Sequence, residues 1–432
     1  MKRYKKYKPS GIEWIGEIPE HWKIIRLKYL SKIENGSTPN TGVVEYWNGK
    51  IRWATPVDVS NAKNYLISDT GKKITKEGFD SCGTTLVEPS SIILTTRAPI
   101  GNVAMAGDYI CTNQGCKAIH LLKANHTYLF YQLLVSKGVL ESLGSGSTFK
   151  ELSTDALKSF LVCLPSNNEQ TVIADYLDSK TAQIDDSIVK KQKLIDLLNE
   201  EKTAIINQTV TKGLNPDAPL KDSGVLWLGE IPEHWEVEKL KYIAETIQTG
   251  STPPTENTEY YLPEISWFTP VDFSDDLMLS DSKRKISTLA VEEGAAKLFK
   301  ENSVLLVGIG ATLGKVGLIS GPASANQQIN VITFDSKLLA KYYLFLLFVN
   351  QKNIAALSNS ATLAILNQTQ TKDVIVPLPD LTEIKEIVGH VEKDIMRIKT
   401  TIRRVDHEIE LLREYRTALI SEAVTGKIDV RI

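Results

Sequence analysis

A glycine-rich stretch in the second half of the chain could bind a phosphate group. Residues 307–317 read VGIGATLGKVG and place a lysine directly after Gly314, as phosphate-binding loops do. Such a loop also needs a glycine five residues before Gly314, where Ile309 stands. It needs Ser or Thr after the lysine, where Val316 stands. The spacing therefore predicts a tight turn between two strands and no nucleotide site.

Four residues of types that bind zinc lie close together in the first half of the chain. They are Cys111, Cys116, His120 and His126. This region recurs later in the chain, and none of the four is matched there by a metal ligand. All the cysteines lie in the first half, again without cysteine counterparts, which argues against a disulfide framework. The sequence therefore predicts structural roles for these residues and no metal site.

Two histidines occupy equivalent places in a repeated heptapeptide. GEIPEHW stands at residues 16–22 and again at 229–235, and it contains His21 and His234. A catalytic pair of histidines is conceivable, but no nucleophile, carboxylate pair or further histidine accompanies them. We expect the histidine and the tryptophan that follows it to dock the N-terminal arm of each copy onto its globule.

The sequence also lacks the residues that nucleic-acid enzymes need. Methyl transfer to DNA needs an S-adenosylmethionine loop and an Asn/Asp-Pro-Pro-aromatic motif. The nearest match, STPPTE at residues 251–256, has neither the Asn/Asp nor the aromatic residue. We identify no helicase or nuclease motif either. The chain is therefore predicted to be a recognition protein and not an enzyme.

These stretches belong to one long internal repeat with an offset of about 213 or 214 residues. GSTP recurs, WATPVDVS returns as WFTPVDFS, PIGNV aligns with TLGKV, and an Asn-Gln pair recurs. In this alignment Arg97 faces Gly310. Both copies also end alike, on TAIINQTVTKGL and TALISEAVTGKI. A repeat of this length indicates a duplicated pair of domains and not a solenoid.

Bulk properties narrow the class of protein. A chain of 432 residues can hold two to four domains. No apolar run could span a bilayer and the first residues lack a signal-peptide core, so a cytoplasmic location is expected. The formal net charge is only −2, but residues 1–165 carry 21 basic against 14 acidic side chains, and residues 216–380 carry 13 against 20. Local patches, and not bulk charge, would have to bind any polyanion.

Each copy consists of a β-rich part followed by a helical part. In the second helical part, apolar residues recur at alternating steps of four and three, with Arg416 as the one polar member. This pattern is a coiled-coil seam of about five heptads, and the first copy repeats it more weakly, with Lys191 and Lys202 at seam positions. At 1.5 Å per residue each helix would be roughly 54 Å long. Its second-copy positions are Ile384, Val388, Val391, Ile395, Ile398, Ile402, Val405, Ile409, Leu412, Arg416 and Leu419.

The expected architecture is α+β, with two pseudo-symmetric mixed α/β domains alternating with two long helices that form an antiparallel coiled coil. We expect a first domain over residues 1–165, a first helix over 166–212, a linker over 213–224, a second domain over 225–379, and a second helix with a C-terminal tail over 380–432. The β-rich parts, residues 12–165 and 225–379, are called globule 1 and globule 2 below.

The combination of motifs resembles the specificity subunit of type I restriction-modification systems. The residues that carry the resemblance are GxIPxHW opening each copy, GSTP, WxTPxD, TRAPIGNV with its partner GATLGKV, and AVTGKIDVR after the second helix. The resemblance covers essentially the whole chain. It implies two target-recognition domains that each read one half of a split DNA sequence, and helices that set the spacing and dock the modification subunits.

The resemblance also implies partners and cofactors. Modification subunits, two per chain, would methylate adenine with S-adenosylmethionine, and restriction subunits would add ATP- and Mg-dependent cleavage. The chain itself would bind double-stranded DNA and hold no cofactor or metal. A DNA-independent scaffold whose globules bind proteins is the alternative, and the acidic second globule favours it.

Residues able to read base edges follow from their chemistry. Arg, Lys, Asn and Gln carry donors and acceptors that match the edges of bases or phosphates. Each candidate could equally be an ordinary surface residue, and the Asn-Gln pairs could instead tie down a loop. The DNA-binding candidates are Arg52, Lys72, Lys73, Arg97, Asn113 and Gln114 in the first copy, and Lys283, Arg284, Lys285, Lys315, Asn326 and Gln327 in the second.

Overall fold

Two helices carry the predicted apolar seam along their whole length. Helix α6 (Asn167–Lys212) has 46 residues and helix α12 (Leu381–Val424) has 44. At 1.5 Å per residue they measure about 69 and 66 Å, longer than the predicted 54 Å. The extra turns follow the seam: Ile206 and Val210 at the end of α6 are buried in the core of the second half of the protein.

The computed structural model describes residues 2–146, 150–274, 276–358 and 364–431. By its internal contacts the chain divides into two units. Unit 1 comprises residues 1–191 and 407–432, and unit 2 comprises residues 192–406. Each unit therefore contains one globule, the beginning of the helix that follows it and the end of the other helix.

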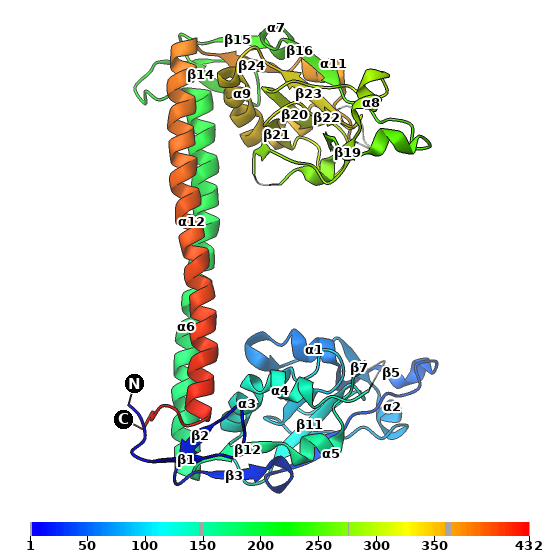
Figure 1. The fold of residues 1–432 in the computed structure, drawn as a ribbon, viewed down its shortest axis with the longest axis vertical. Coiled ribbons are helices and arrows are strands. Elements are labelled where there is room, and N and C mark those ends of the chain that lie inside the picture. The colour runs from blue at the N-terminus through cyan, green and yellow to red at the C-terminus, as the bar shows by residue number, and fades with distance from the viewer. Residues whose placement is uncertain (1, 147–149, 275, 359–363, 432) are drawn as a thin grey trace. The chain divides into compact units, whose positions relative to one another are not determined.

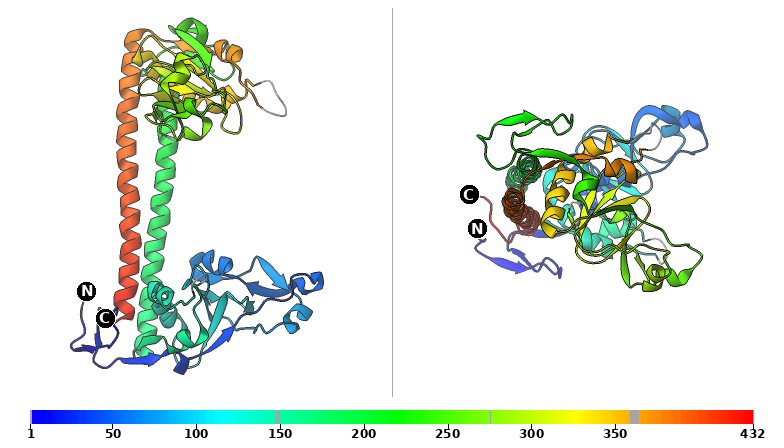
Figure 2. Two further views of the ribbon diagram at one scale, coloured as in Figure 1. Left: turned by 45° about the vertical axis from the view of Figure 1, so that its right-hand side comes forward. Right: turned by 90° about the horizontal axis from the view of Figure 1, so that it is seen from above.

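The two helices pack side by side and antiparallel, as the sequence predicts (Figures 1 and 2). Asp185 of α6 pairs with Arg416 of α12, and further along α6 Glu201 pairs with Arg397. The residue number rises along one helix as it falls along the other, which defines an antiparallel pair. Every seam position named above is buried or half-buried, including the polar Lys191, Lys202 and Arg416.

Globule 1 is built on two sheets. The larger has the strand order β4-β11-β8-β9-β6 and is antiparallel except for the pair β6 and β9. The smaller has the order β10-β5-β7, with β10 parallel to β5. The strand bounds are β4 Ser31–Asn35, β5 Trp47–Ala54, β6 Leu66–Ile67, β7 Lys72–Ile74, β8 Ile92–Thr95, β9 Val103–Ala106, β10 Ile110–Thr112 and β11 Cys116–Leu121.

Globule 2 repeats both sheets in the same strand order. The larger sheet is β16-β23-β20-β21-β18 and the smaller is β19-β17-β22. Residues 307–316 form the tight turn between the antiparallel strands β20 and β21, which confirms the prediction made from the failed phosphate-loop spacing. The bounds are β16 Thr246–Thr249, β17 Ile265–Phe268, β18 Met278–Leu279, β19 Lys285–Ile286, β20 Ser303–Val307, β21 Val316–Ile319, β22 Ser324–Ala325 and β23 Ile329–Thr333.

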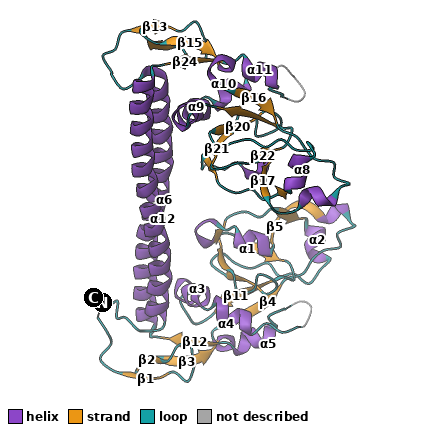
Figure 3. Ribbon diagram, turned by 45° about the horizontal axis from the view of Figure 1, so that its top comes forward, coloured by secondary structure: helices purple, strands orange, loops and turns teal. Residues whose placement is uncertain are grey.

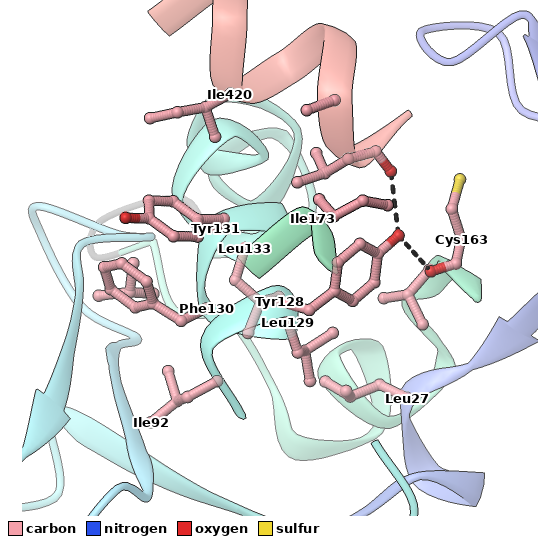
Figure 4. Packing of buried hydrophobic residues seen from close by; sticks show 14 of the residues in the cluster. Leu27, Ile92, Tyr128, Leu129, Phe130, Tyr131, Leu133, Cys163, Ile173 and Ile420 are labelled. Atoms are coloured by element: carbon pink, nitrogen blue, oxygen red, sulfur yellow. Dashed lines mark hydrogen bonds between the residues drawn. The ribbon is translucent and has the colours of Figure 1, made fainter. Parts of the chain in front are cut away.

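One apolar helix in each globule joins the larger sheet to the long helices (Figure 3). In unit 1 this is α3 (His126–Val135), and in unit 2 it is α9 (Lys337–Val349). The hydroxyl of Tyr128 lies 3.0 Å from the carbonyl oxygen of Cys163 and 3.1 Å from that of Val424, at the end of α12 (Figure 4). Tyr342 of α9 donates to the carbonyl oxygen of Val210, at the end of α6, over 2.8 Å. Each unit is thus completed by the end of the other copy's helix.

Short segments fasten the outer end of each unit. In unit 1, β3 (Lys23–Arg26) pairs with β12 (Leu161–Leu164), and β1 (Tyr7–Pro9) pairs with β2 (Glu17–Pro19). Unit 2 repeats both ladders. They are β15 (Glu236–Lys239) with β24 (Ile375–Leu378), and β13 (Leu220–Asp222) with β14 (Glu230–Pro232). Among the described residues, no helix is both long enough and apolar enough to cross a membrane.

The remaining helices are short and connect or cover the sheets. Those of unit 1 are α1 Pro56–Ser60, α2 Lys76–Asp80, α4 Lys137–Ser142, α5 Thr154–Ser159 and the 3-10 turns η1 Leu27–Tyr29, η2 Val44–Tyr46 and η3 Lys63–Tyr65. Those of unit 2 are α7 Leu240–Ile243, α8 Thr288–Glu292, α10 Gln351–Ala355, α11 Gln368–Lys372 and the 3-10 turns η4 Thr258–Tyr261 and η5 Pro270–Asp272.

Candidate nucleic-acid interface

The repeated motifs of globule 1 meet at one edge of its larger sheet. The GSTP segment follows β4, and the backbone N–H of Ser37 donates to the carbonyl oxygen of Thr112 over 2.9 Å. The indole N–H of Trp53 donates to the carbonyl oxygen of Ser37 over 2.9 Å. A Cβ added at Gly36 would lie 1.9 Å from the carbonyl oxygen of Asn113, so only glycine fits there. We call this region, residues 35–39, 53–58, 95–97, 113–117 and 151–154, the motif edge.

Globule 2 forms the same motif edge from its own copies of these motifs. The backbone N–H of Ser251 donates to the carbonyl oxygen of Ala325 over 2.8 Å, and the indole N–H of Trp267 donates to that of Ser251 over 3.1 Å. A Cβ at Gly250 would lie 2.3 Å from the carbonyl oxygen of Ala325. The second motif edge comprises residues 249–253, 267–272, 307–309, 326–330 and 365–368. The repeated residues therefore build a common backbone frame.

The aspartate of each WxTPxD motif fastens the smaller sheet to this frame. Asp58 accepts from the backbone N–H of Thr55 over 2.8 Å in a capping box, and its other oxygen accepts from the N–H of Gly71 over 2.8 Å. Asp272 does the same for Thr269, over 2.7 Å, and for Lys283, over 2.9 Å. Both oxygens of each carboxylate accept from a backbone N–H, and one also accepts from the hydroxyl of the motif's threonine, which explains why the motif is repeated.

Three of the basic candidates beside the smaller sheet are compensated by acidic neighbours. Arg52 lies 2.8 Å from a carboxylate oxygen of Asp108. Lys73 lies 2.9 Å from Asp69 and, by donating to it, holds the pKa of that carboxyl below its ordinary value. Lys285 does the same to Asp281 in globule 2, over 3.1 Å. The charge of each of these three residues is therefore paired within its own globule, where it helps to hold the smaller sheet in place.

The other candidates near these strands leave their charge at the surface. Lys72 lies over the ring of Trp47, and Arg284 lies over that of Trp267. Lys283 is exposed beside Arg284, at the position where globule 1 has Gly71. Of the basic candidates beside the smaller sheet, these three are therefore the better placed to meet a phosphate or a base edge.

The Asn-Gln pairs divide their roles. Asn113 accepts from the backbone N–H of Gly115 over 3.0 Å, and Asn326 accepts from that of Gln328 over 3.1 Å, so both asparagines tie down their loops. Gln114 and Gln327 are exposed, and each accepts a short hydrogen bond from a threonine of the GSTP segment. The glutamine amide N–H groups remain available at the surface of the motif edge.

Lys315 is half-buried in the β20–β21 turn. Its ammonium lies 3.5 Å from the carbonyl oxygen of Phe273, which it helps to hold. In globule 1 the equivalent turn contains Arg97, which lies 3.1 Å from Glu151 and is half exposed.

The structure corrects the predicted alignment at Arg97. The backbone of Thr96 bonds to Gly115 and Leu152, and that of Gly308 bonds to the equivalent Gln328 and Leu366. Arg97 therefore corresponds to Ile309 and not to Gly310. The β20–β21 turn is one residue longer than the β8–β9 turn, and sequence matching placed that insertion one position too early.

A buried cation lies beside Arg97. Lys117 is 6% exposed and donates to the side-chain oxygen of Asn35 over 2.9 Å. Burial lowers the pKa of its ammonium below the ordinary value. Globule 2 has Asn330 at the same place in the strand. The sequence analysis did not select Lys117. A lysine within an otherwise apolar strand is unusual, however, and could have identified it.

The repeated histidines belong to a clasp and not to a catalytic site. His21 lies 3.0 Å from a carboxylate oxygen of Glu169, and the indole N–H of Trp22 donates to Glu169 over 3.1 Å. His234 and Trp235 make the same contacts with Glu383, over 3.0 and 2.8 Å. These residues dock the arm as predicted, but the predicted target is wrong: they bind a glutamate of the long helix and not a residue of the globule. Sequence reasoning missed both glutamates, although they are 214 residues apart like the rest of the repeat.

The cysteine-histidine stretch does not converge on a metal. Cys111 and Cys116 are buried, and burial raises the pKa of each thiol to about 12, which disfavours the thiolate form that binds metals. His120 and His126 lie beside each other with ring centroids 6.3 Å apart. Within the described ranges, no three His, Cys, Asp or Glu side chains are grouped closely enough to hold a metal ion.

Comparison with known proteins agrees with this architecture. A sequence model of the type I restriction modification DNA specificity domain matches residues 19–197 and again 232–410. The chain is 28% identical to the MjaIX specificity subunit of Methanocaldococcus jannaschii, over 96% of this chain and 95% of that protein. It is 21% identical to the EcoDI specificity subunit of Escherichia coli, over 96% and 90%.

Two solved structures share the fold. The HsdS subunit from Thermoanaerobacter tengcongensis has 16% identity and a TM-score of 0.57, over 95% of this chain and 98% of that one. A chain from a structural study of assembly and conformational transition in a type I restriction-modification system has 16% identity and a TM-score of 0.66, over 95% and 99%. Since the family match covers both halves, the chain belongs to the DNA specificity subunits of type I restriction-modification systems.

Proposed function

We propose that each globule reads one half of a bipartite DNA target. The observation that supports this proposal is that both globules build the same backbone frame but carry different side chains on it. The two motif edges share their backbone hydrogen bonds, yet Arg97 is replaced by Ile309. Next to the edges, where the backbone N–H groups bind Asp58 and Asp272, Gly71 is replaced by Lys283. A common frame with variable side chains suits two domains that bind the same polymer and distinguish different sequences.

The contacts described in unit 1 have counterparts in unit 2, in which the two copies of the repeat have swapped roles. Tyr128 and Tyr342 bind the ends of opposite helices, and Glu169 and Glu383 hold equivalent clasps. Such an exchange of equivalent contacts between the two copies favours half-sites in inverted orientation, as symmetric dimers read them. The antiparallel helices would set the spacing of the half-sites and dock the modification subunits, two per chain.

The chemistry would belong to the partner subunits. Modification subunits would bring S-adenosylmethionine, and restriction subunits would bring ATP and Mg for cleavage. The chain itself would be a non-catalytic subunit that acts in the cytoplasm. We expect no methyltransferase, nuclease or ATPase activity from the purified chain, and methyl transfer by the chain alone, beyond trace contamination, would contradict this.

A domain exchange tests the modular reading. Residues 12–165 are replaced by the equivalent domain of a relative, and the methylome of cells that carry the system is sequenced. We expect one half-site to change completely and the other to remain. Exchange of residues 225–379 is the matched control and should change the opposite half-site. A simultaneous change of both half-sites in either chimera would contradict separate reading.

A DNA-independent protein scaffold is the second candidate, because residues 216–380 carry 13 basic against 20 acidic side chains. DNA reading predicts that the complex with modification subunits binds its duplex with a steep loss of affinity as salt rises. A scaffold predicts weak binding without preference for the methylated sequence.

A further inference from the structure

The two motif edges differ at one antiparallel bridge. In globule 1 this bridge joins Arg97 and Glu151, and in globule 2 it joins Ile309 and Ile365. The adjoining backbone is the same. The N–H of Leu152 donates to the carbonyl oxygen of Thr96 over 2.9 Å, and its counterpart at Leu366 donates to Gly308 over 2.8 Å. One backbone arrangement thus presents a charged pair in one globule and an apolar pair in the other.

The charged pair is held in a defined orientation. Arg97 Nε and Nη2 both lie 3.1 Å from Glu151 Oε2. The side chains are 49% and 40% exposed. Among the residues that the structure describes, Arg97 Nη1 and Glu151 Oε1 have no hydrogen-bonding partner. The pair therefore presents guanidinium N–H donors beside an unoccupied carboxylate oxygen.

This array complements the major-groove edge of a G·C base pair. Guanine presents two acceptors, O6 and N7, which match the two outer donors of an arginine. The paired cytosine presents the N4 amino donor, which a glutamate accepts. The ion pair itself is exposed, so turning its free atoms toward a base sacrifices little stability. Lys117, buried next to it, adds positive charge that favours a DNA surface.

The apolar pair complements a different base. Ile309 and Ile365 are half-buried and offer no donor or acceptor from their side chains. An apolar surface at this position matches the 5-methyl group of thymine and leaves the polar edge of a G·C pair without partners.

We propose that Arg97 and Glu151 together read one G·C base pair of the first half-site, and that Ile309 and Ile365 contact a thymine at the equivalent place in the second. This inference rests on the proposed half-site reading. It assigns Glu151, Ile309 and Ile365 a specificity-determining role and gives the chemical identity of one base pair in each half-site.

The test is methylome sequencing of cells that express the full chain with its modification subunits. The double variant R97I/E151I installs the pair that globule 2 already carries on the same backbone, so the frame accommodates it. We expect one G·C position of the first half-site to become T·A or unspecified, while the second half-site is unchanged. The loss of discrimination at that position should be about 5- to 150-fold, which corresponds to about 1–3 kcal/mol.

The reciprocal variant I309R/I365E should gain a G·C requirement in the second half-site. K6A/E20A removes an exposed ion pair from the N-terminal arm, where Lys6 lies 3.9 Å from Glu20, and should leave the motif unchanged. If R97I/E151I gives no methylation, the affinity of the complex for DNA is measured instead. The duplexes compared carry each of the base pairs at that position. A remaining preference for G·C would then overturn the inference.

The outcomes separate this inference from the proposed function. A bipartite wild-type motif that persists unaltered in both double variants overturns the inference and leaves half-site reading intact. A wild-type first half-site without a G·C pair has the same consequence. A wild-type motif that is not bipartite overturns the proposed function itself.

Discussion

The junction between globule and helix pair is built differently in the two units. In unit 1, Arg416 lies over the ring of Tyr65 and makes a two-pronged ion pair with Asp185, at 2.9 and 3.2 Å. Unit 2 has Lys202, Leu277 and Lys399 among the residues at this junction, which line an apolar cavity of about 420 Å³. Unit 1 also has a cavity at its junction, of about 480 Å³, but Tyr65, Asp185 and Arg416 are among the residues that line it. The two junctions therefore differ in their lining: one carries an aromatic ring and an ion pair, and the other is mainly apolar.

The clasps and the motif edges, unlike the junctions, are built in the same way in both units. His21 and Trp22 bind Glu169 as His234 and Trp235 bind Glu383, and the glycines of both GSTP segments face backbone carbonyls. Residues that satisfy backbone groups or fit against them are the same in both copies. The side chains at the Arg97–Glu151 bridge and at the junctions have diverged. The comparison separates a fixed frame from surfaces free to specialise.

The largest expected effect comes from removing the difference between the units altogether. A chain of residues 1–215 contains globule 1 and the whole of α6, so two copies could pair their helices antiparallel. The dimer should methylate an interrupted palindrome of the first half-site, because symmetric protein requires symmetric DNA. Methylome sequencing with the modification subunit present is the measurement.

Modification subunits should be needed to stabilise this dimer. Its seam would hold Lys191 and Lys202, without the apolar residues of α12. A folded dimer bound to its partner that yields only the original asymmetric motif would contradict the pseudo-symmetry.

Lengthening both helices should change the spacing between the two half-sites of the DNA target and leave the half-sites themselves unchanged. Four residues are inserted at facing positions, after Leu198 in α6 and after Thr401 in α12, so that the ion pairs on either side keep their partners. The insertion adds about 6 Å, near the rise of two base pairs, and a net rotation of about 40°, near the twist of one. A four-residue stutter is also tolerated in coiled coils.

We expect the methylated motif to gain about two base pairs in its spacer with both half-sites intact. Insertion into α6 alone is the control, since it breaks the register between the helices and should reduce methylation. A helical double-insertion variant that methylates only the original spacing would show that the helices do not set it.

The clasps should differ in strength although their geometry is the same. The Glu169 side chain is 4% exposed and also lies 3.6 Å from Arg431, whereas the Glu383 side chain is 20% exposed. E169A should therefore destabilise unit 1 by about 3 kcal/mol, and E383A should destabilise unit 2 by about 1–2 kcal/mol. Hydrogen–deuterium exchange resolves the two units. E20A, on an exposed residue of the same arm, is the control and should change the stability of either unit by less than about 0.5 kcal/mol. A larger loss of stability from E383A than from E169A would refute the ranking.

The smallest expected effect concerns the junctions. Y65L removes the ring beneath Arg416, so it should cost unit 1 about 1–2 kcal/mol. L277Y places a ring in the cavity of unit 2 and should stabilise it by up to about 1 kcal/mol. Thermal unfolding monitored by circular dichroism compares the two variants with the wild type. If the cavity cannot admit the ring, both variants will instead unfold at a lower temperature than the wild type.

The sequence alone determined the duplication, the α+β class, the two long helices and their seam. These features are encoded locally: alternating steps of four and three fix the buried face of a helix, and short apolar runs between turn residues fix the strands. The repeat also identified GSTP, WxTPxD and the Asn-Gln pairs as important, because two copies retained them.

Only the tertiary structure decided what those residues do. It placed GSTP against the Asn-Gln turn, gave the clasp histidines a glutamate on the long helix, and moved the counterpart of Arg97 from Gly310 to Ile309. It also paired Arg97 with Glu151, 54 positions further along the chain. Such contacts depend on where distant segments meet and not on local periodicity, since a one-residue insertion in a turn shifts sequence matching but leaves the strand ladder in register.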